Sequence, residues 1–115
     1  MSLLGSSTWS PISGGITSPD GFLASGISAG LKPSGKKDLA LLYAPDNSCC
    51  SGTFTQSGAR AYCVDLCIDR LRATQGKIRA VVINAGQANA CTGHRGKIDS
   101  EVITHEIAKR LGLSN

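Results

Sequence analysis

The sequence has few aromatic residues, which make up 4% of its 115 residues, and it has no long apolar run. A membrane helix needs roughly 20 consecutive apolar residues, so no membrane contact is expected. Met1 to Ser10 lack a basic segment followed by an apolar stretch, so neither a secretory signal nor a transit peptide is predicted. We therefore expect a cytoplasmic protein of one domain, with a core of Ala, Val, Ile and Leu.

The sequence also lacks a concentrated charge of one sign. Twelve Lys and Arg oppose eight Asp and Glu, and the resulting net charge of +4 is spread from Lys32 to Arg110. Hardly any aromatic side chain lies beside the basic residues to stack on bases, so no nucleic-acid partner is expected. A general attraction for small anionic metabolites stays open.

The five cysteines contain no C-x-x-C pair of the kind that zinc ribbons use. Reduced thiols are the expectation, and neither a metal site nor a cofactor is predicted. Cys63 and Cys67 lie in a segment with strand-like residues, where they can pack as small hydrophobic side chains.

Turn residues and apolar spacing predict a mixed α+β fold. Turns are expected at Gly14-Gly15 and Pro19-Gly21, followed by an extended segment over 22–31. The runs 38–44 and 50–55 predict a hairpin or two adjacent strands around the turn 45–48, with a weaker strand over 61–66. Ile78 to Ala85 is rich in β-branched residues and is predicted to be a central strand buried on both faces.

Two helices are expected in the second half. A short surface helix is predicted over 67–74, with Gly76 as its stop. A clearer amphipathic helix of about three turns is predicted from Asp99 or Ser100 to Gly112. Its apolar stripe consists of Ile103, Ile107 and Leu111.

Three partial motifs do not support the chemistry that they suggest. Gly30 to Lys36 resembles a P-loop, but Lys37 replaces the Ser or Thr that holds magnesium, and a strand follows rather than a helix. His105-Glu106 begins a zinc-protease motif, but Lys109 occupies the second histidine position, so both residues are predicted on the solvent face. Cys91 and the nearby His94 are interpreted as an inert thiol and its neighbour.

The segment from Asn84 to Gly93 has an unusual composition. Its small residues let the backbone approach a ligand or another strand closely, and its amides and hydroxyls offer donors and acceptors that do not titrate. The candidate substrate-binding residues are Asn84, Gly86, Asn89 and Thr92, and no catalytic residue is assigned. Asn and Gly that merely satisfy a buried turn are the alternative.

This segment resembles the Asn-Ser-Gly-Asn-Ala-Asn-Ala-Cys-Thr-Gly signature of the bifunctional ornithine acetyltransferases, or glutamate N-acetyltransferases, of arginine biosynthesis. Three further blocks resemble that family in the same order, and the four together cover about residues 9 to 112. They are Gly14 to Phe22, Ser34 to Leu41 and Gly52 to Thr55. Ala85, Gln87 and the segment 57–59 depart from the family pattern.

The resemblance implies the layered α-β-β-α sandwich of that self-processing family. It also implies transfer of an acetyl group from N-acetylornithine to glutamate, and some members also use acetyl-coenzyme A. The family's nucleophile is a threonine exposed by self-cleavage at an Ala-Thr bond, with its own amine as base. The implied partners are the rest of the α chain, the cleaved β chain and further copies in a homo- or hetero-oligomer.

The family's oxyanion motif, Ser-Thr-Gly-Val-Ile-Gly, follows the helix that ends near Leu111, and its cleavage motif comes later still. The sequence stops at Asn115, and neither motif is found in it. Residues 1–115 are therefore predicted to be a single incomplete domain, the front portion of an α chain, inactive by itself. The alternative is a non-catalytic module for assembly or for binding a small metabolite, whose polar loop holds an anion on backbone N–H groups.

Overall fold

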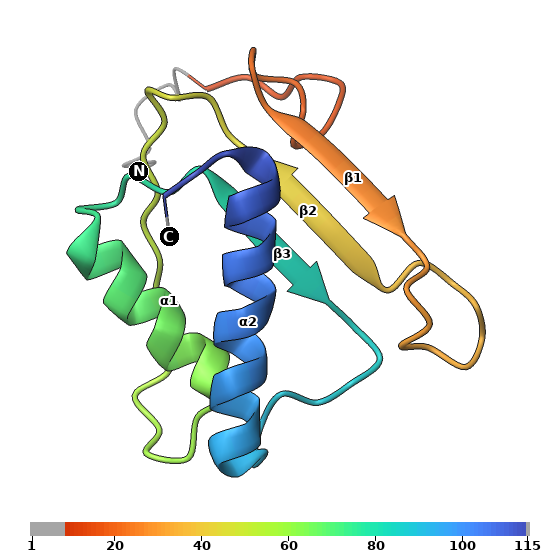
Figure 1. Ribbon diagram of the computed structural model, residues 1–115. Helices are drawn as coiled ribbons and strands as arrows, with labels where there is room; N and C mark the ends of the chain where they lie inside the picture. Colours follow the sequence, from red (N-terminus) through yellow and green to blue (C-terminus); the bar gives the residue numbers. More distant parts are fainter. Residues whose placement is uncertain (1–8, 115) are drawn as a thin grey trace, which may run out of the picture.

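Three strands and two helices make up residues 9–114, the part of the chain that the computed structural model describes (Figure 1). The prediction that Met1 to Ser10 carry no targeting signal falls almost wholly outside this part. The predicted α+β class is confirmed. In chain order the elements are β1 (Leu23–Ile27), β2 (Leu39–Tyr43), α1 (Tyr62–Ala73), β3 (Ala80–Asn84) and α2 (Gly93–Leu111).

The strands form one sheet in the order β1-β2-β3, and both neighbouring pairs are antiparallel. Leu41 of β2 lies opposite Ser25 of β1 and Val82 of β3, so these three residues share one face of the sheet. Leu42 and Val81 lie opposite each other on the other face. Apolar residues therefore occur on both faces, as in a sheet that is one layer within a larger stack.

The prediction of a central strand buried on both faces is wrong for β3. Within the described residues β3 lies at the edge of the sheet, paired with β2 alone. Val81 and Ile83 remain 43% and 49% exposed, whereas Ala80 and Val82 on the opposite face are half-buried. A run of β-branched residues indicates that a segment is suited to a buried sheet, but it does not predict which strand or layer will lie beside it.

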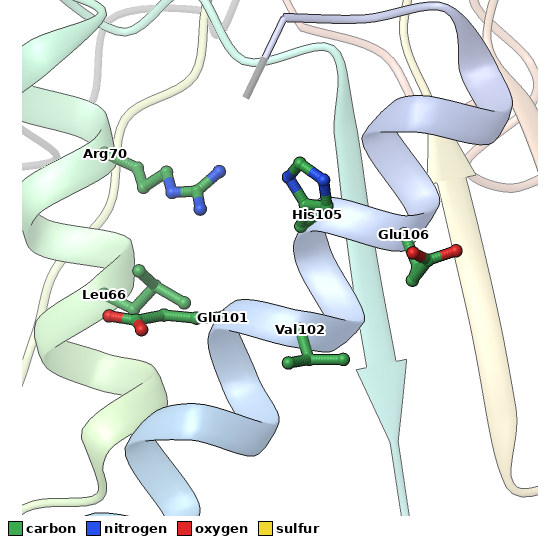
Figure 2. Close-up of a pocket in the computed structure, with 6 residues that line it drawn as sticks. All are labelled: Leu66, Arg70, Glu101, Val102, His105 and Glu106. Atoms are coloured by element: carbon green, nitrogen blue, oxygen red, sulfur yellow. The ribbon is translucent and has the colours of Figure 1, made fainter.

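The two helices form a second layer on one face of the sheet. Figures 1 and 2 both show α2 in front of β3, with α1 beside α2. Tyr62 Oη donates a hydrogen bond to Glu101 Oε1 at 2.9 Å, and Arg70 Nη2 donates to Thr104 Oγ1 at 3.3 Å. Because Val82 is less exposed than Val81, we infer that the helices cover the Val82 face.

Helix α2 starts earlier than the sequence predicts. It begins at Gly93 and spans 19 residues, and Ser100 lies inside it with its hydroxyl donating to the Gly96 carbonyl at 2.7 Å. Asp99 pairs with Arg95 at 2.8 Å. Residues 93–97 at the start of the helix have no apolar side chain, so the apolar spacing predicted only the later, amphipathic part. The predicted stop is confirmed, because Gly112 adopts a left-handed φ of 67°.

Residues 62–66 are helical, which corrects the prediction of a strand over 61–66. Helix α1 begins at Tyr62 and includes both Cys63 and Cys67, so the predicted helix over 67–74 is only its second half. Tyr62 and Leu66 are four residues apart and lie on one side of the helix. The contact with α2 through Tyr62 favours this helix over a strand.

The predicted turns are confirmed, but the predicted hairpin is not formed. The N–H of Ser18 bonds the Gly15 carbonyl, and that of Ser48 bonds the Pro45 carbonyl, each at 3.0 Å. Residues 50–55 form no strand. The N–H of Cys50 instead donates to the carbonyl of Gly76 at 2.8 Å, which holds this segment beside the end of α1.

No apolar side chain is buried among residues 9–114, and Asp38 is the one residue in that range that is buried. The expected core of Ala, Val, Ile and Leu is therefore not closed by this part of the chain. Two layers of this size leave the second face of the sheet and the outer face of the helices open.

Candidate functional site

The four residues predicted to bind substrate lie on the connection from β3 to α2. Asn84 is the last residue of β3, Thr92 immediately precedes α2, and Gly86 and Asn89 lie between them. Asn89 Nδ2 donates to Asn84 Oδ1 at 3.0 Å, and Thr92 Oγ1 donates to the Asn89 carbonyl at 3.3 Å. The structure thus brings three of the four residues together through hydrogen bonds.

The fourth residue, Gly86, lies against a different segment. Its φ of +93° belongs to the left-handed region that favours glycine. A Cβ atom at this position would lie 2.6 Å from Lys32 Cγ and 3.1 Å from the Leu31 carbonyl oxygen. The close approach of two backbones therefore requires glycine here, as the composition of the segment predicts.

A carboxylate that the sequence reasoning did not single out connects these segments. Asp38, 4% exposed, accepts hydrogen bonds from the N–H of Ala29 to Oδ1 at 2.6 Å and from the N–H of Lys32 to Oδ2 at 2.8 Å. Its own carbonyl accepts the N–H of Ala85 at 2.9 Å. The hydrogen bond from the Ala29 N–H has the largest effect and lowers the pKa of Asp38, and the bond from the Lys32 N–H lowers it further. The positive charge of the Lys32 side chain acts in the same direction.

One feature of the sequence around Asp38 could have indicated its role. Asp38 is a lone carboxylate between the Gly-rich turn that ends at Lys37 and an apolar strand. Such a carboxylate can cap the exposed N–H groups of the turn before it. This feature could not show that the carbonyl of the same residue also holds the segment that begins at Ala85.

The Thr92 end of the loop borders a small hollow of about 210 Å³. Thr92 and Gly93 line one side, and Arg60 and Tyr62 line the other. Arg60 is occupied by Asp65, which accepts from its Nε at 2.5 Å. The lining therefore combines a neutralised ion pair with hydroxyl and backbone groups, which suits a small polar ligand without strong charge. Its residues are Arg60, Tyr62, Asp65, Cys91, Thr92 and Gly93.

The bend into α2 has a strained backbone. Cys91 is a non-glycine residue with a φ of +56°, and Gly93, two residues further on, has a φ of +58°. A side chain in this region costs about 1–2 kcal/mol, so surrounding contacts must hold it there. The Thr92 side chain forms no cap hydrogen bond to the start of α2, so its hydroxyl is directed to Asn89 instead.

A larger, open hollow of about 530 Å³ lies between α1 and α2 (Figure 2). Figure 2 shows the Arg70 and His105 side chains extending into the gap, with Glu106 on the side of α2 away from Arg70. His105 and Glu106 are exposed, as the sequence predicts. None of the four candidate residues lines this hollow. Its lining residues are Leu66, Arg70, Glu101, Val102, His105 and Glu106.

The cysteines do not form a recognisable reactive centre in the described range. Cys91 is exposed, and burial followed by the neighbouring Cys63 and Cys50 raises the pKa of Cys67, which disfavours its thiolate. Among residues 9–114, no three His, Cys, Asp or Glu side chains gather as metal ligands would. In the same range, no helix combines the length and apolarity that crossing a bilayer demands.

The sequence profile described as "ArgJ family" matches residues 23–115. The arginine biosynthesis bifunctional protein ArgJ of Prochlorococcus marinus (strain NATL2A) is 80% identical over the whole chain, which covers 27% of that protein. The protein of the same name from Parasynechococcus marenigrum (strain WH8102) is 63% identical over 93% of the chain and is 26% covered. The chain therefore spans about a quarter of the length of the curated relatives it matches.

Two solved structures resemble the fold. An ornithine acetyltransferase from Mycobacterium tuberculosis, complexed with ornithine, matches with a TM-score of 0.79 and 39% identity over 85% of this chain and 50% of that one. The arginine biosynthesis bifunctional protein argJ from Bacillus halodurans matches with a TM-score of 0.81 and 31% identity, covering 88% of this chain and 52% of that one. The sheet and the helices described above are thus a portion of a larger fold.

Proposed function

The chain belongs to the ArgJ family, and from that premise we propose that it is the front portion of a cytoplasmic acetyltransferase of arginine biosynthesis. The enzyme moves an acetyl group from N-acetylornithine to glutamate. The observation that carries the proposal is the fold match, at 39% identity, to an ornithine acetyltransferase whose structure holds ornithine.

In this proposal Asn84, Gly86, Asn89 and Thr92 line the substrate site. The hydrogen bonds from Asn89 to Asn84 and from Thr92 to Asn89 pre-organise the loop, so ligand binding need not order it. Neutral amides and a hydroxyl can bind an acetamido group or an amino-acid carboxylate without adding a charge that competes with the reaction. Gly86 keeps the backbone close enough for the loop to retain this shape.

The chain by itself is proposed to be inactive. The resemblance assigns acetyl transfer to a threonine whose free amino group serves as base. Its hydroxyl attacks the acetyl carbonyl of N-acetylornithine and releases ornithine, and the amine of glutamate then attacks the acetyl ester and releases the hydroxyl. No residue of residues 1–115 is assigned that role or the role of oxyanion donor. The remaining α segment, the cleaved β chain and further subunits of an oligomer are the proposed partners, and acetyl-coenzyme A is a second proposed donor.

A chimera tests the proposal directly. This chain replaces the aligned segment of the Prochlorococcus marinus relative, with which it shares 80% identity. We expect self-cleavage into two chains and transfer of labelled acetyl from N-acetylornithine to glutamate. A folded chimera that moves no acetyl group would contradict the proposal.

The substrate loop is tested with matched pairs in the same chimera. Asn84→Ala and Thr92→Ala are expected to lower kcat/KM by about tenfold to a hundredfold, because small misplacements at a site have effects of that size. Asn47→Ala and Thr53→Ala, both at exposed positions outside the loop, should stay close to the parent. If Asn84→Ala and Asn47→Ala, or Thr92→Ala and Thr53→Ala, changed kcat/KM equally, the loop would not be part of the substrate site.

Calorimetric titration of the 115-residue chain separates this proposal from a metabolite-binding module. Glutamate, N-acetylornithine and acetyl-coenzyme A are injected in turn, and little heat is expected, because only part of the site is present. Saturable binding of one of them at micromolar concentration would favour the module.

A further inference from the structure

We propose that Asp38 is a positioning residue that holds the Asn84–Thr92 loop in its binding shape by clamping the turn 29–32 against Gly86. The inference rests on the proposed function for the role of that loop. The juxtaposition itself is independent of substrate, because it consists of contacts within the chain.

The first part of the clamp is the carboxylate. Both of its oxygens accept backbone N–H groups from one turn, Ala29 at 2.6 Å and Lys32 at 2.8 Å. Charge-assisted bonds of this length are stronger than bonds between neutral groups. Asn in place of Asp38 would present one acceptor and one NH2 group, so one of the two backbone N–H groups would face another donor.

The second part is the backbone of the same residue. The N–H of Asp38 donates to the Ile27 carbonyl at 3.0 Å, and its carbonyl accepts the N–H of Ala85 at 2.9 Å. Asp38 therefore bonds to the end of β1, to the turn 29–32 and to the first residue after β3. These are the three segments that meet beside the candidate loop.

The third part is the seat of Gly86. The Leu31 carbonyl and the Lys32 side chain leave no room for a Cβ at this position, so the turn held by the carboxylate forms the wall against which Gly86 rests. Lys32 Nζ donates to the Lys37 carbonyl at 3.2 Å, which keeps that side chain folded over the turn. If the turn moves, Gly86 loses this wall, and Asn84 and Asn89 on either side of it lose their fixed separation.

Nuclear magnetic resonance of the whole 115-residue chain tests the clamp. In Asp38→Asn we expect faster hydrogen exchange at Ala85 and lower backbone order parameters through the loop. The Asn89 side-chain amide signals should move toward those of free asparagine as its bond to Asn84 weakens. Asp46→Asn, at a carboxylate that is 90% exposed, is the matched control and should leave these signals in place.

Gly86→Ala perturbs the same contact from the opposite side and retains Asp38. It should loosen the loop in the same way, whereas Gly112→Ala, with a φ of +67° also in the left-handed region and open space around it, should not. If Asp38→Asn does not fold, hydrogen exchange of the backbone N–H groups in the unsubstituted chain tests the clamp. Ala29, Lys32 and Ala85 should then open together with one denaturant dependence, and independent opening would overturn the clamp.

Kinetics in the chimera separates this inference from the proposed function. Asp38→Asn should raise KM for N-acetylornithine about tenfold or more with a smaller change in kcat, since a displaced binding loop weakens binding of the substrate and of the transition state to a similar extent. A loop that stays ordered in Asp38→Asn while Ala29 and Lys32 exchange faster would overturn the inference. A loosened loop with an unchanged KM would support the clamp and contradict the substrate role of the loop.

Discussion

Gly76 provides a quantitative test of the connection between α1 and the segment before it. Its φ is +79°, and a Cβ atom would lie 2.7 Å from the carbonyl oxygen of Cys50. The obstacle is backbone, and the same two residues share the bond from the Cys50 N–H to the Gly76 carbonyl. Gly76→Ala therefore adds a conformational penalty and a steric one.

Two other glycines separate these penalties. Gly112 has a φ of +67° and open space, so Gly112→Ala tests the backbone conformation alone. Gly58 has neither feature, so Gly58→Ala tests the effect on the unfolded chain. The left-handed conformation costs alanine about 1–2 kcal/mol. Overpacking costs about 1–3 kcal/mol, and the stiffer unfolded chain returns about 0.4–1 kcal/mol.

The expected losses in the free energy of unfolding follow from these values. Gly76→Ala should lose about 2–4 kcal/mol and Gly112→Ala about 1 kcal/mol, and Gly58→Ala should gain up to about 1 kcal/mol. Urea denaturation followed by circular dichroism measures each midpoint, with an unchanged slope confirming that the same surface unfolds. Equal losses for Gly76→Ala and Gly112→Ala would refute the steric contact with Cys50.

Three further outcomes are expected. Arg79→Lys should destabilise the chain by about 1–2 kcal/mol in urea denaturation, because the guanidinium donates to the Ala44 carbonyl and the Tyr43 hydroxyl and lies 5.1 Å from the centre of the Tyr43 ring. Asp46, the ion-pair partner of Arg79, is 90% exposed, so Asp46→Asn should have little effect on the urea midpoint. The hydrogen bond to Glu101, and then burial, raise the pKa of Tyr62 above its ordinary 10.0. The contribution of Tyr62 to folding stability should therefore be complete below pH 10 and be lost as the pH rises through the folded-state pKa. Urea midpoints measured from pH 9 to 12 should fall less steeply in Tyr62→Phe than in the parent chain. The pKa of Asp38 is lowered from 3.8, so its stabilisation should be present above that pH and be lost as the pH falls through the folded-state pKa, and Asp38→Asn should flatten this acid limb.

The sequence by itself determined the family, the fold class and the features that depend on short stretches of chain. The four motif blocks led to the family, and the family profile and close relatives confirm it. Turn chemistry located the bends at Gly15 and Pro45, and Gly112 marked the end of α2, because each of these depends on the conformational preferences of a few adjacent residues. The placement of the candidate residues on one loop also followed from their closeness in sequence.

Only the tertiary structure decided which segments pair and what holds the loop. The N–H of Cys50 bonds the carbonyl of Gly76 and not β2, and a helix begins at Tyr62, whose hydroxyl contacts Glu101, 39 positions away in the sequence. Within the described residues β3 lies at the edge of the sheet. The sequence could not predict this, because the burial of a strand depends on its neighbours, which a hydrophobic pattern does not specify. The connection from Asp38 to Ala85 joins residues 47 positions apart by backbone groups that every residue possesses, so no side-chain pattern could reveal it.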